Sequence, residues 1–231
     1  MRLLALDLDT PVHTTFSRRS LSLPIRKTLT ETRGPVHGVI DATGLKVYGA
    51  GEGQAEKHGI KPRRTWRKLP VGVDPDSGEI LACALTPKEV DDRSQVAPLL
   101  DQVAGEITAV MADGAYDGDP TYRTVAERAL AAAVIIPPRS TAVPSATAAT
   151  APTQRDRHRA TIAKRGRLGW QRVCNDGRRS RVETTMYRYK VLIGRSLHAR
   201  SLPAQKVEAR VACQVLNRMT RLGMPASRRV D

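Results

Sequence analysis

Three acidic residues, far apart in the sequence, stand where a carboxylate could bind a metal ion. Asp41 lies inside a β-rich apolar run, Asp113 follows a second apolar run, and Glu183 is the single acid within a basic stretch. Three carboxylates that meet at one point repel each other strongly unless divalent cations neutralise them. Their oxygens are hard ligands that suit Mg²⁺ or Mn²⁺. These residue types therefore predict metal-dependent phosphoryl transfer, provided that the fold brings them together.

The stretch 178–190 predicts a helix with two different faces. At 3.6 residues per turn, Arg179, Glu183 and Lys190 fall on one charged stripe. The apolar stripe beside it consists of Val182, Met186, Tyr189 and Ile193. An apolar stripe packed on a core would hold Glu183 rigidly at the edge of a basic surface. An ordinary amphipathic helix, in which Glu183 pairs with Arg179 and with solvent, fits the same spacing.

The charge of the chain predicts a nucleic-acid partner. Its 231 residues include 38 Lys and Arg against 23 Asp and Glu, a net charge of +15, and this length suits one main domain. The positive excess is concentrated in residues 57–68 and 155–200. With one Phe and two Trp, the chain has few rings that could stack on bases. Double-stranded DNA, bound through its phosphates, is therefore favoured over single strands.

The cysteines and the apolar runs exclude several other classes of protein. Cys83, Cys174 and Cys213 lack paired spacing, so they predict neither a zinc site nor a disulfide framework. No apolar run approaches 18 residues, and Asp7 and Asp9 interrupt the first one. We therefore expect a soluble cytoplasmic protein with reduced thiols and no membrane partner.

The first half of the chain predicts the sheet that carries Asp41. Residues 1–34 have no clear period and predict a weakly ordered lead-in. An antiparallel meander of three strands follows, over residues 36–48, 66–73 and 79–85. Asp74 and Asp76 fit the turn before the last of these strands. A carboxylate in a buried strand, such as Asp41, is costly unless it binds a cation or is well hydrogen-bonded. A turn role for Asp41 beside Gly44 remains open.

The second half predicts alternating helices and strands. Helices are expected over residues 91–103, 120–132 and 205–222, with buried strands over 107–112 and 133–136. Asp113 comes just past a central strand, where open α/β sheets place ligand-binding residues. Residues 139–170 predict a flexible basic insertion. The core-facing residues expected on the last helix are Val207, Val211, Val215, Leu216 and Met219.

Several motifs carry a resemblance to a known family. They are residues 39–46, 64–69, 73–75 with 78–80, 113–117 and 216–220. In addition, Arg179 stands four residues before the third acid and Lys190 seven after it. Over residues 15–226 the chain resembles the DDE transposases of bacterial insertion sequences, in the insertion-sequence-five-like group. One position departs from the family's pattern, because Asp176 replaces a tyrosine that is expected to face phosphate.

The resemblance implies both a fold and a metal site. The fold is α/β, a ribonuclease-H-like mixed sheet flanked by helices, with the catalytic domain over residues 35–226 and a tail over 227–231. Asp41, Asp113 and Glu183 would hold two Mg²⁺ ions, for which Mn²⁺ may substitute.

The resemblance also implies contacts with double-stranded DNA. The expected phosphate-binding residues are Arg179, Lys190, Arg63, Arg64 and Lys68. The implied activity is strand cleavage at insertion-sequence ends and strand transfer into target DNA, by a homodimer on DNA. Members of the family are longer at the front, so the chain resembles an N-terminally shortened copy. A truncated, catalytically inactive DNA-binding remnant is the alternative.

Overall fold

A mixed β-sheet forms the centre of the protein. The computed structural model describes residues 15, 19, 28–30, 34–47 and 66–223. The longer strands follow the order β3-β2-β1-β5-β6, while β4 pairs with β2 and β7 pairs with β1. The strands are β1 (Val36–Val47), β2 (Trp66–Val73), β3 (Ile80–Cys83), β4 (Thr86–Pro87), β5 (Ile107–Ala112), β6 (Ala133–Ile135) and β7 (Ser196–Leu197). Strands β1, β2 and β3 form the expected antiparallel meander, whereas β5 and β6 run parallel to β1.

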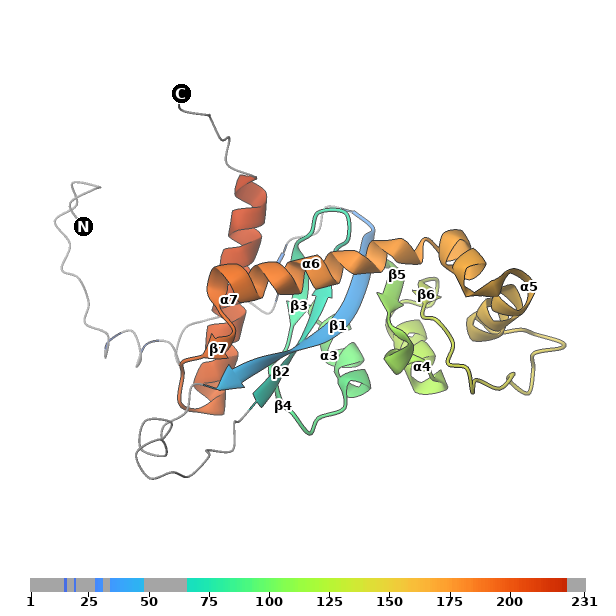
Figure 1. Ribbon diagram of the computed structural model, residues 1–231, viewed down its shortest axis with the longest axis horizontal. Coiled ribbons are helices and arrows are strands. Elements are labelled where there is room, and N and C mark those ends of the chain that lie inside the picture. The colour runs from blue at the N-terminus through green and yellow to red at the C-terminus, as the bar shows by residue number, and fades with distance from the viewer. Residues whose placement is uncertain (1–14, 16–18, 20–27, 31–33, 48–65, 224–231) are drawn as a thin grey trace.

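Helices cover both faces of this sheet (Figure 1). They are η2 (Asp92–Gln95), α3 (Val96–Leu100), η3 (Gly114–Tyr116), α4 (Asp119–Arg128), α5 (Gln154–Cys174), η4 (Asp176–Arg179), α6 (Ser180–Arg188), the π-helical η5 (Tyr189–Ile193) and α7 (Leu202–Leu222). Neighbouring strand residues alternate between two core clusters, because successive side chains of a strand point to opposite faces. Val39 belongs to the cluster under α6 and α7, and Ile40 to the cluster under α3 and α4. The expectation of a mixed α/β fold is confirmed.

The turn between β2 and β3 is built by Asp74, as its sequence predicts. The Asp74 carboxylate accepts hydrogen bonds from the backbone N–H groups of Asp76 and Ser77 and from the Ser77 hydroxyl. The carboxylate of Asp76 has a different partner, the guanidinium of Arg178 at the start of the Glu183 helix. Asp74 therefore forms the turn, and Asp76 links it to the helical layer.

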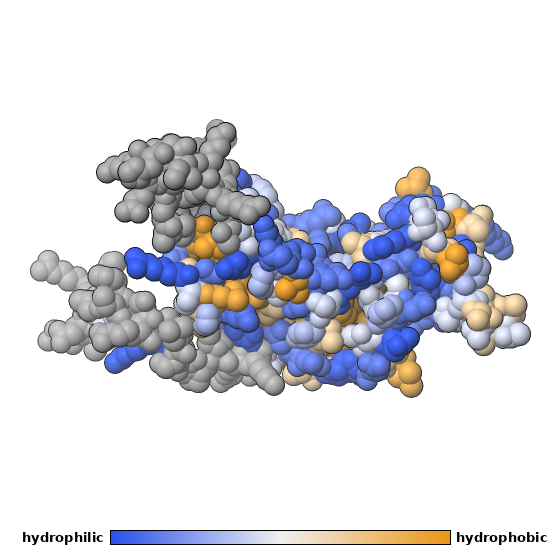
Figure 2. Space-filling view, turned by 90° about the horizontal axis from the view of Figure 1, so that it is seen from below, coloured by the Kyte–Doolittle hydropathy of each residue, from blue (hydrophilic) through white to orange (hydrophobic). Residues whose placement is uncertain are grey.

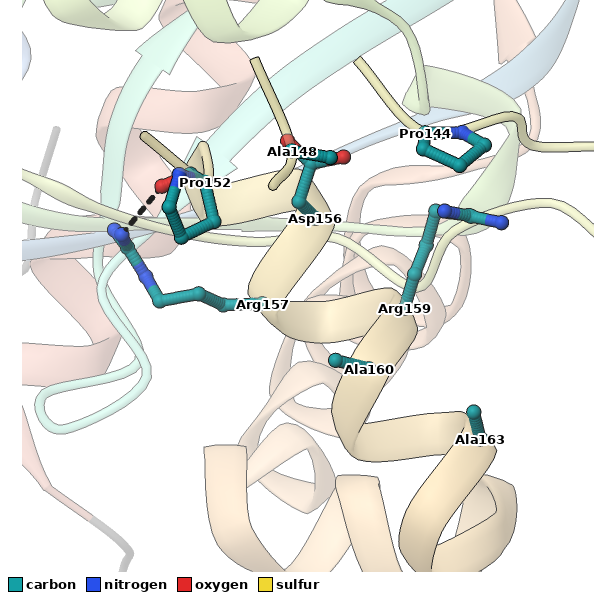
Figure 3. A pocket seen from close by; sticks show the side chains of 8 residues that line it. All are labelled: Pro144, Ala148, Pro152, Asp156, Arg157, Arg159, Ala160 and Ala163. Atoms are coloured by element: carbon teal, nitrogen blue, oxygen red, sulfur yellow. Dashed lines mark hydrogen bonds between the residues drawn. The ribbon is translucent and has the colours of Figure 1, made fainter. Parts of the chain in front are cut away.

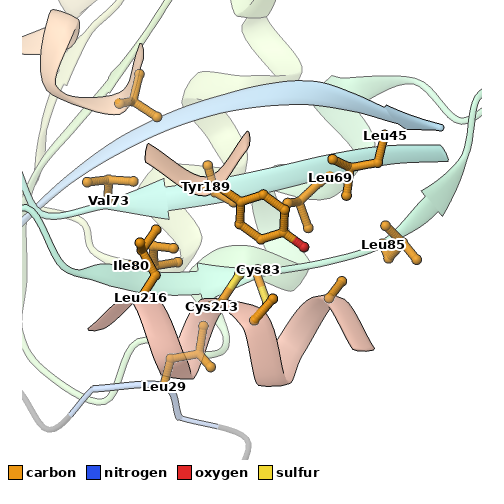
Figure 4. Packing of buried hydrophobic residues seen from close by; sticks show 14 of the residues in the cluster. Leu29, Leu45, Leu69, Val73, Ile80, Cys83, Leu85, Tyr189, Cys213 and Leu216 are labelled. Atoms are coloured by element: carbon orange, nitrogen blue, oxygen red, sulfur yellow. The ribbon is translucent and has the colours of Figure 1, made fainter. Parts of the chain in front are cut away.

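Helix α7 packs on the sheet with a different face from the one expected. Leu216 is buried as predicted, but Val211, Val215 and Met219 are each about 40% exposed. The buried side chains are Gln205, Ala209, Ala212, Cys213, Leu216 and Asn217. Figure 4 shows Cys213 and Leu216 of this face beside Cys83 and Ile80 of β3. Small residues let α7 approach β3 closely, so the apolar stripe read from the sequence was the wrong one.

Polar side chains complete the junction between α7 and β3. The Asn217 amide oxygen accepts from the Ile80 N–H at 2.7 Å, and its amide nitrogen donates to the Ile80 carbonyl at 2.8 Å. Asn217 thus satisfies both backbone groups of an edge residue, which a neighbouring strand would otherwise do. The predicted buried face of α7 was wrong because it was chosen from apolar residues alone, and a buried polar residue such as Asn217 does not contribute to apolar periodicity.

The segment 139–170 also differs from the sequence expectation. Residues 154–174 form helix α5, which begins at a capping box made by Thr153 and Asp156 and is kinked at Gly166, where φ is 70°. Trp170 is fully buried, and its indole N–H donates to His158 at 2.9 Å. The expectation of an irregular insertion therefore fails over residues 154–170. The buried residues of α5 are Asp156 and Trp170, and one buried apolar residue gives no periodic pattern from which a packed helix could be predicted.

Two smaller expectations concern the thiols and the membrane. Cys83, Cys174 and Cys213 are all free thiols. Within the described ranges, no helix is long and apolar enough to cross a bilayer. Most of the predicted lead-in and the whole tail 227–231 lie outside the described residues.

Candidate active site

Asp41 and Asp113 lie on neighbouring parallel strands. Ile40 of β1 is paired with Ala112 of β5, so each acid directly follows a paired residue. Asp41 is the first residue of β1 beyond its pairing with β5, while its backbone stays paired with Val71 of β2. By strand alternation its side chain shares the face of Val39, which α6 covers. The register therefore brings these two acids together, as the sequence predicts.

The backbone of Asp113 leaves β5 through a tight turn. Asp113 caps the short helix η3, and its Oδ1 accepts a hydrogen bond from the Ala115 N–H at 2.8 Å. At Gly114 a Cβ atom would lie 3.3 Å from the Pro137 carbonyl oxygen, which is tighter than most contacts of this kind. The ring of Tyr116 is buried in the second core cluster and anchors the end of the turn. Close packing against Pro137 thus favours glycine directly after Asp113.

Glu183 comes from α6, which crosses the sheet (Figure 1). Its apolar side packs as predicted at Val182 and Tyr189, both buried, while Ile193 is 39% exposed. From Tyr189 the hydrogen-bonding pattern of the helix changes from α to π. This change rotates Ile193 away from the predicted apolar stripe. The Glu183 side chain is 64% exposed and lies 3.9 Å from the Arg179 guanidinium. The charged stripe therefore exists, with Arg179 and Glu183 paired along it.

Asp176 lies behind Arg179. Its side chain is 3% exposed, and its Oδ1 lies 3.6 Å from Arg179 Nε, too long for a hydrogen bond. Arg179 therefore stands between a buried carboxylate and the exposed carboxylate of Glu183. The sequence placed Asp176 beside bound phosphate, whereas the structure buries it against the arginine expected to bind that phosphate.

The pKa of Asp41 is shifted by burial and by the charges of the other two acids. Burial raises the pKa of Asp41, and the negative charges of Asp113 and Glu183 raise it further. The Ala42 N–H and the positive charge of Arg179 act in the opposite direction. A cation would relieve this repulsion, because it stabilises the ionised forms together.

The two aspartates suit a divalent cation, and Glu183 is an exposed carboxylate beside Arg179. Asp41 and Asp113 each use only Oδ1 for a backbone hydrogen bond, from Ala42 at 2.7 Å and Ala115 at 2.8 Å. Their second oxygens remain available as hard ligands. Across the residues that the structure describes, no three acidic, histidine or cysteine side chains are close enough to hold one metal ion. Glu183 is instead oriented toward Arg179.

The expected DNA-binding residues differ in their surroundings. Lys190 has no hydrogen-bond or ion-pair partner among the described residues and is half-buried. The Lys68 ammonium donates to the Val90 carbonyl at 2.9 Å and lies 3.2 Å from an Asp92 carboxylate oxygen. Arg63 and Arg64 lie outside the described residues. Lys68 thus holds β2 to the start of η2 in this structure.

Sequence reasoning missed the residues that support the Asp113 turn. Asp117, fully buried at its side chain, is bound by Arg155 of α5. Arg139 donates to two carbonyls of the same turn. The only sequence signal was Asp117 itself, the second acid of the 113–117 motif, since nothing in the spacing pointed to either arginine.

A pocket of about 450 Å³ lies apart from the three acids, along α5 (Figure 3). Its lining residues are Pro144, Ala148, Pro152, Asp156, Arg157, Arg159, Ala160 and Ala163. Both arginines donate to backbone carbonyls, Arg157 to Pro152 and Arg159 to Ala142. The pocket was not predicted, because residues 139–170 were expected to lack regular structure.

Comparison with known proteins identifies the family. Residues 32–218 match a family model described as "Transposase DDE domain", and a second model with the same description matches residues 1–50. Among solved structures, the fold is similar to piggyBac transposase in a synaptic complex with hairpin DNA, with a TM-score of 0.53 at 12% sequence identity. That match covers 92% of this chain and 54% of the piggyBac chain, so this chain spans about half of its length. Because the first model covers most of the chain, the protein belongs to the family of transposase DDE domains.

Proposed function

We propose that this chain is a DDE transposase of the bacterial insertion-sequence-five-like group, with a sheet of the ribonuclease-H-like kind. It would cut DNA at insertion-sequence ends and join the cut strand to target DNA. The observation that supports this most is the register of β1 and β5, which sets Asp41 and Asp113 directly after paired residues of neighbouring parallel strands, where the charges of Arg179 and Glu183 also act on Asp41. Membership of the DDE family adds the reaction class.

The proposed reaction consists of two phosphoryl transfers. In the first, a water oxygen attacks the phosphorus at the element's end, and the bond to the 3′ oxygen breaks to leave a 3′ hydroxyl. In the second, that hydroxyl attacks a phosphorus of target DNA, forming one phosphodiester as another breaks. Asp41, Asp113 and Glu183 would hold Mg²⁺ or Mn²⁺, which polarises phosphoryl oxygens and lowers the pKa of bound water.

The basic residues would bind the DNA backbone around this site. Arg179 has a planar fork that suits paired phosphate contacts, and Lys190 supplies a point charge. In the described structure Arg179 faces Glu183. Engagement with phosphate would release Glu183 toward the two aspartates, so DNA and metal would complete the site together. Arg63, Arg64 and Lys68 would extend the contact, and we propose a homodimer as the active form on DNA.

The proposal is tested by metal-dependent cleavage of plasmid and linear duplex DNA. Cleavage should require Mg²⁺ or Mn²⁺, and Ca²⁺ should bind without supporting turnover because its coordination is larger and looser. Asp41→Asn, Asp113→Asn and Glu183→Gln should each abolish cleavage and spare DNA binding. An Asp113→Asn variant that cleaves at the parent rate would show that the assignment is wrong.

A DNA-binding protein without catalysis is the second candidate. Among the described residues no three acidic, histidine or cysteine side chains are grouped to hold a metal ion, and Glu183 pairs with Arg179, and both observations favour it. Such a protein would bind duplex DNA with the salt dependence of phosphate contacts, a log–log slope of roughly −0.9 per contact. It would show no cleavage with either metal, which separates it from the first candidate.

A further inference from the structure

The turn that carries Asp113 is held by a set of contacts from outside the strand. Arg139 donates through Nε to the Gly114 carbonyl at 3.0 Å and through a terminal nitrogen to the Ala115 carbonyl at 2.7 Å. Its backbone N–H donates to Asp117 Oδ2 at 3.0 Å. Arg139 thus binds three residues of the turn, two at its start and one at its end.

Asp117 joins the same turn to helix α5. Its carboxylate accepts two hydrogen bonds from Arg155, at 2.7 and 3.0 Å, in the paired geometry that makes arginine–carboxylate contacts strong. The side chain of Asp117 is fully buried and that of Arg155 is 17% exposed. Although burial raises the pKa of Asp117, the hydrogen bonds from Arg155 and from the Arg139 N–H outweigh it and lower the pKa. Asp117 is therefore a buried anion with all of its charge compensated.

These contacts act on Asp113 through the backbone. The Ala115 N–H, which donates to the Asp113 carboxylate, belongs to the residue whose carbonyl Arg139 binds. The Gly114 carbonyl accepts from both Arg139 and the Asp117 N–H. If the Arg139 side chain is removed, the Gly114 and Ala115 carbonyls lose their guanidinium donors, and the Gly114 carbonyl keeps only the longer hydrogen bond from the Asp117 N–H at 3.3 Å. The direction of the Asp113 carboxylate would then be less well defined.

We propose that Arg139, Asp117 and Arg155 are positioning residues that fix the orientation of the Asp113 carboxylate for a divalent cation. The proposal rests on the proposed function for the identity of that ligand. None of the three touches the reacting atoms in this arrangement, so their role is to hold the metal ligand. Supporting groups of this kind typically affect metal affinity by 10- to 100-fold when removed.

The sign of the effect separates positioning from simple charge. Arg139 places a positive charge beside the turn, so its loss should strengthen cation binding if only charge mattered. Loss of positioning should weaken binding instead. Arg139→Lys keeps the charge but cannot bind both carbonyls with a planar fork. It should therefore resemble Arg139→Ala rather than the parent.

The experiment uses the full chain without DNA. Mn²⁺ binding is titrated by electron paramagnetic resonance for the parent, Arg139→Ala, Arg139→Lys and Arg159→Ala. Arg159 is the matched control, because its Nε also donates to a backbone carbonyl, that of Ala142, which lies outside the Asp113 turn. Both Arg139 variants should weaken Mn²⁺ binding by about tenfold or more. Arg159→Ala should leave it unchanged.

A second measurement does not depend on the metal. Amide exchange by NMR should accelerate at Ala115, Tyr116 and Asp117 in Arg139→Ala, because their N–H groups close the turn. Parent-like exchange and parent-like Mn²⁺ binding in that variant would overturn the proposal. Unchanged Mn²⁺ binding in Asp113→Asn would instead show that the metal assignment fails, and the exchange rates would still decide whether Arg139 holds the turn.

Discussion

The Asp113 turn and the Glu183 helix carry two acids of the same proposed site, but they differ in how firmly neighbouring side chains hold each acid. Asp113 stands at a turn bound by Arg139 and by the buried Asp117–Arg155 pair. Glu183 is 64% exposed, and the Arg179 guanidinium lies 3.9 Å from its carboxylate. The comparison suggests a site in which the strand side is preorganised and the helix side adjusts when DNA binds.

The largest expected effect tests whether the two acids tolerate change differently. Asp113→Glu should reduce cleavage as severely as Asp113→Asn, by about 10³-fold or more, because the turn is too constrained to absorb an added methylene. Glu183→Asp should retain measurable cleavage, since an exposed side chain on a helix has room to adjust. Initial rates with Mn²⁺ would measure both. Equal losses in the two conservative variants would break the comparison.

The same contrast should appear in stability. Asp117→Ala leaves the largely buried Arg155 guanidinium with only the longer, exposed contact to Asp119 at 3.8 Å, and should lower the free energy of unfolding by about 3 kcal/mol. Glu183→Ala should change it by about 0.5 kcal/mol or less, because the side chain is exposed. Urea unfolding midpoints of the two variants give the answer. A small loss in Asp117→Ala would mean that the turn is held mainly by Arg139.

Asp176 offers a smaller effect on the helix side. Asp176→Asn removes the buried charge beside Arg179 and should make that arginine more available to phosphate. Duplex affinity should rise by roughly fivefold, equivalent to about 1 kcal/mol. The control Asp101→Asn removes an exposed acid far along the chain and so corrects for the change in net charge. If fluorescence anisotropy shows equal gains in both variants, Asp176 has no specific effect on DNA binding.

Tyrosine is a poor replacement at position 176, because the position is buried and the larger side chain would overpack it.

The smallest expected effect is on stability at low pH, through the Glu79–Arg221 pair that anchors α7. Hydrogen bonds from Arg221 lower the pKa of Glu79 from its ordinary value of 4.5. A depressed pKa stabilises the fold fully above that ordinary value, and the contribution is lost as pH falls through the lower folded value. Glu79→Gln should therefore show a shallower loss of stability below about pH 4.5 than the parent. Thermal unfolding between pH 3 and 6 measures the slope. Identical slopes would mean that this pair does not anchor α7.

Much of the arrangement followed from local pattern. The strand over Trp66–Val73, the buried strand before Asp113 and the turn at Asp74 were all predicted, because alternation, β-branched residues and turn chemistry are local properties. The position of Asp113 past its strand followed for the same reason. The α7 face and the α5 helix were missed. Asn217 of α7 is bound to the distant strand residue Ile80, and Trp170 is buried against His158, twelve residues away in α5.

The sequence by itself identified three acids in a basic chain as candidate metal ligands, because carboxylates are hard ligands and Lys and Arg favour phosphate. Only the tertiary structure decided how each acid is held. The pairing of Ile40 with Ala112 sets Asp41 beside Asp113, and Arg139 reaches back over more than twenty residues to fix the turn. The burial of Asp176 against Arg179 was equally invisible in the sequence. Ion pairs and hydrogen bonds between distant segments depend on where the backbone brings them, and residue spacing along the chain carries no record of that.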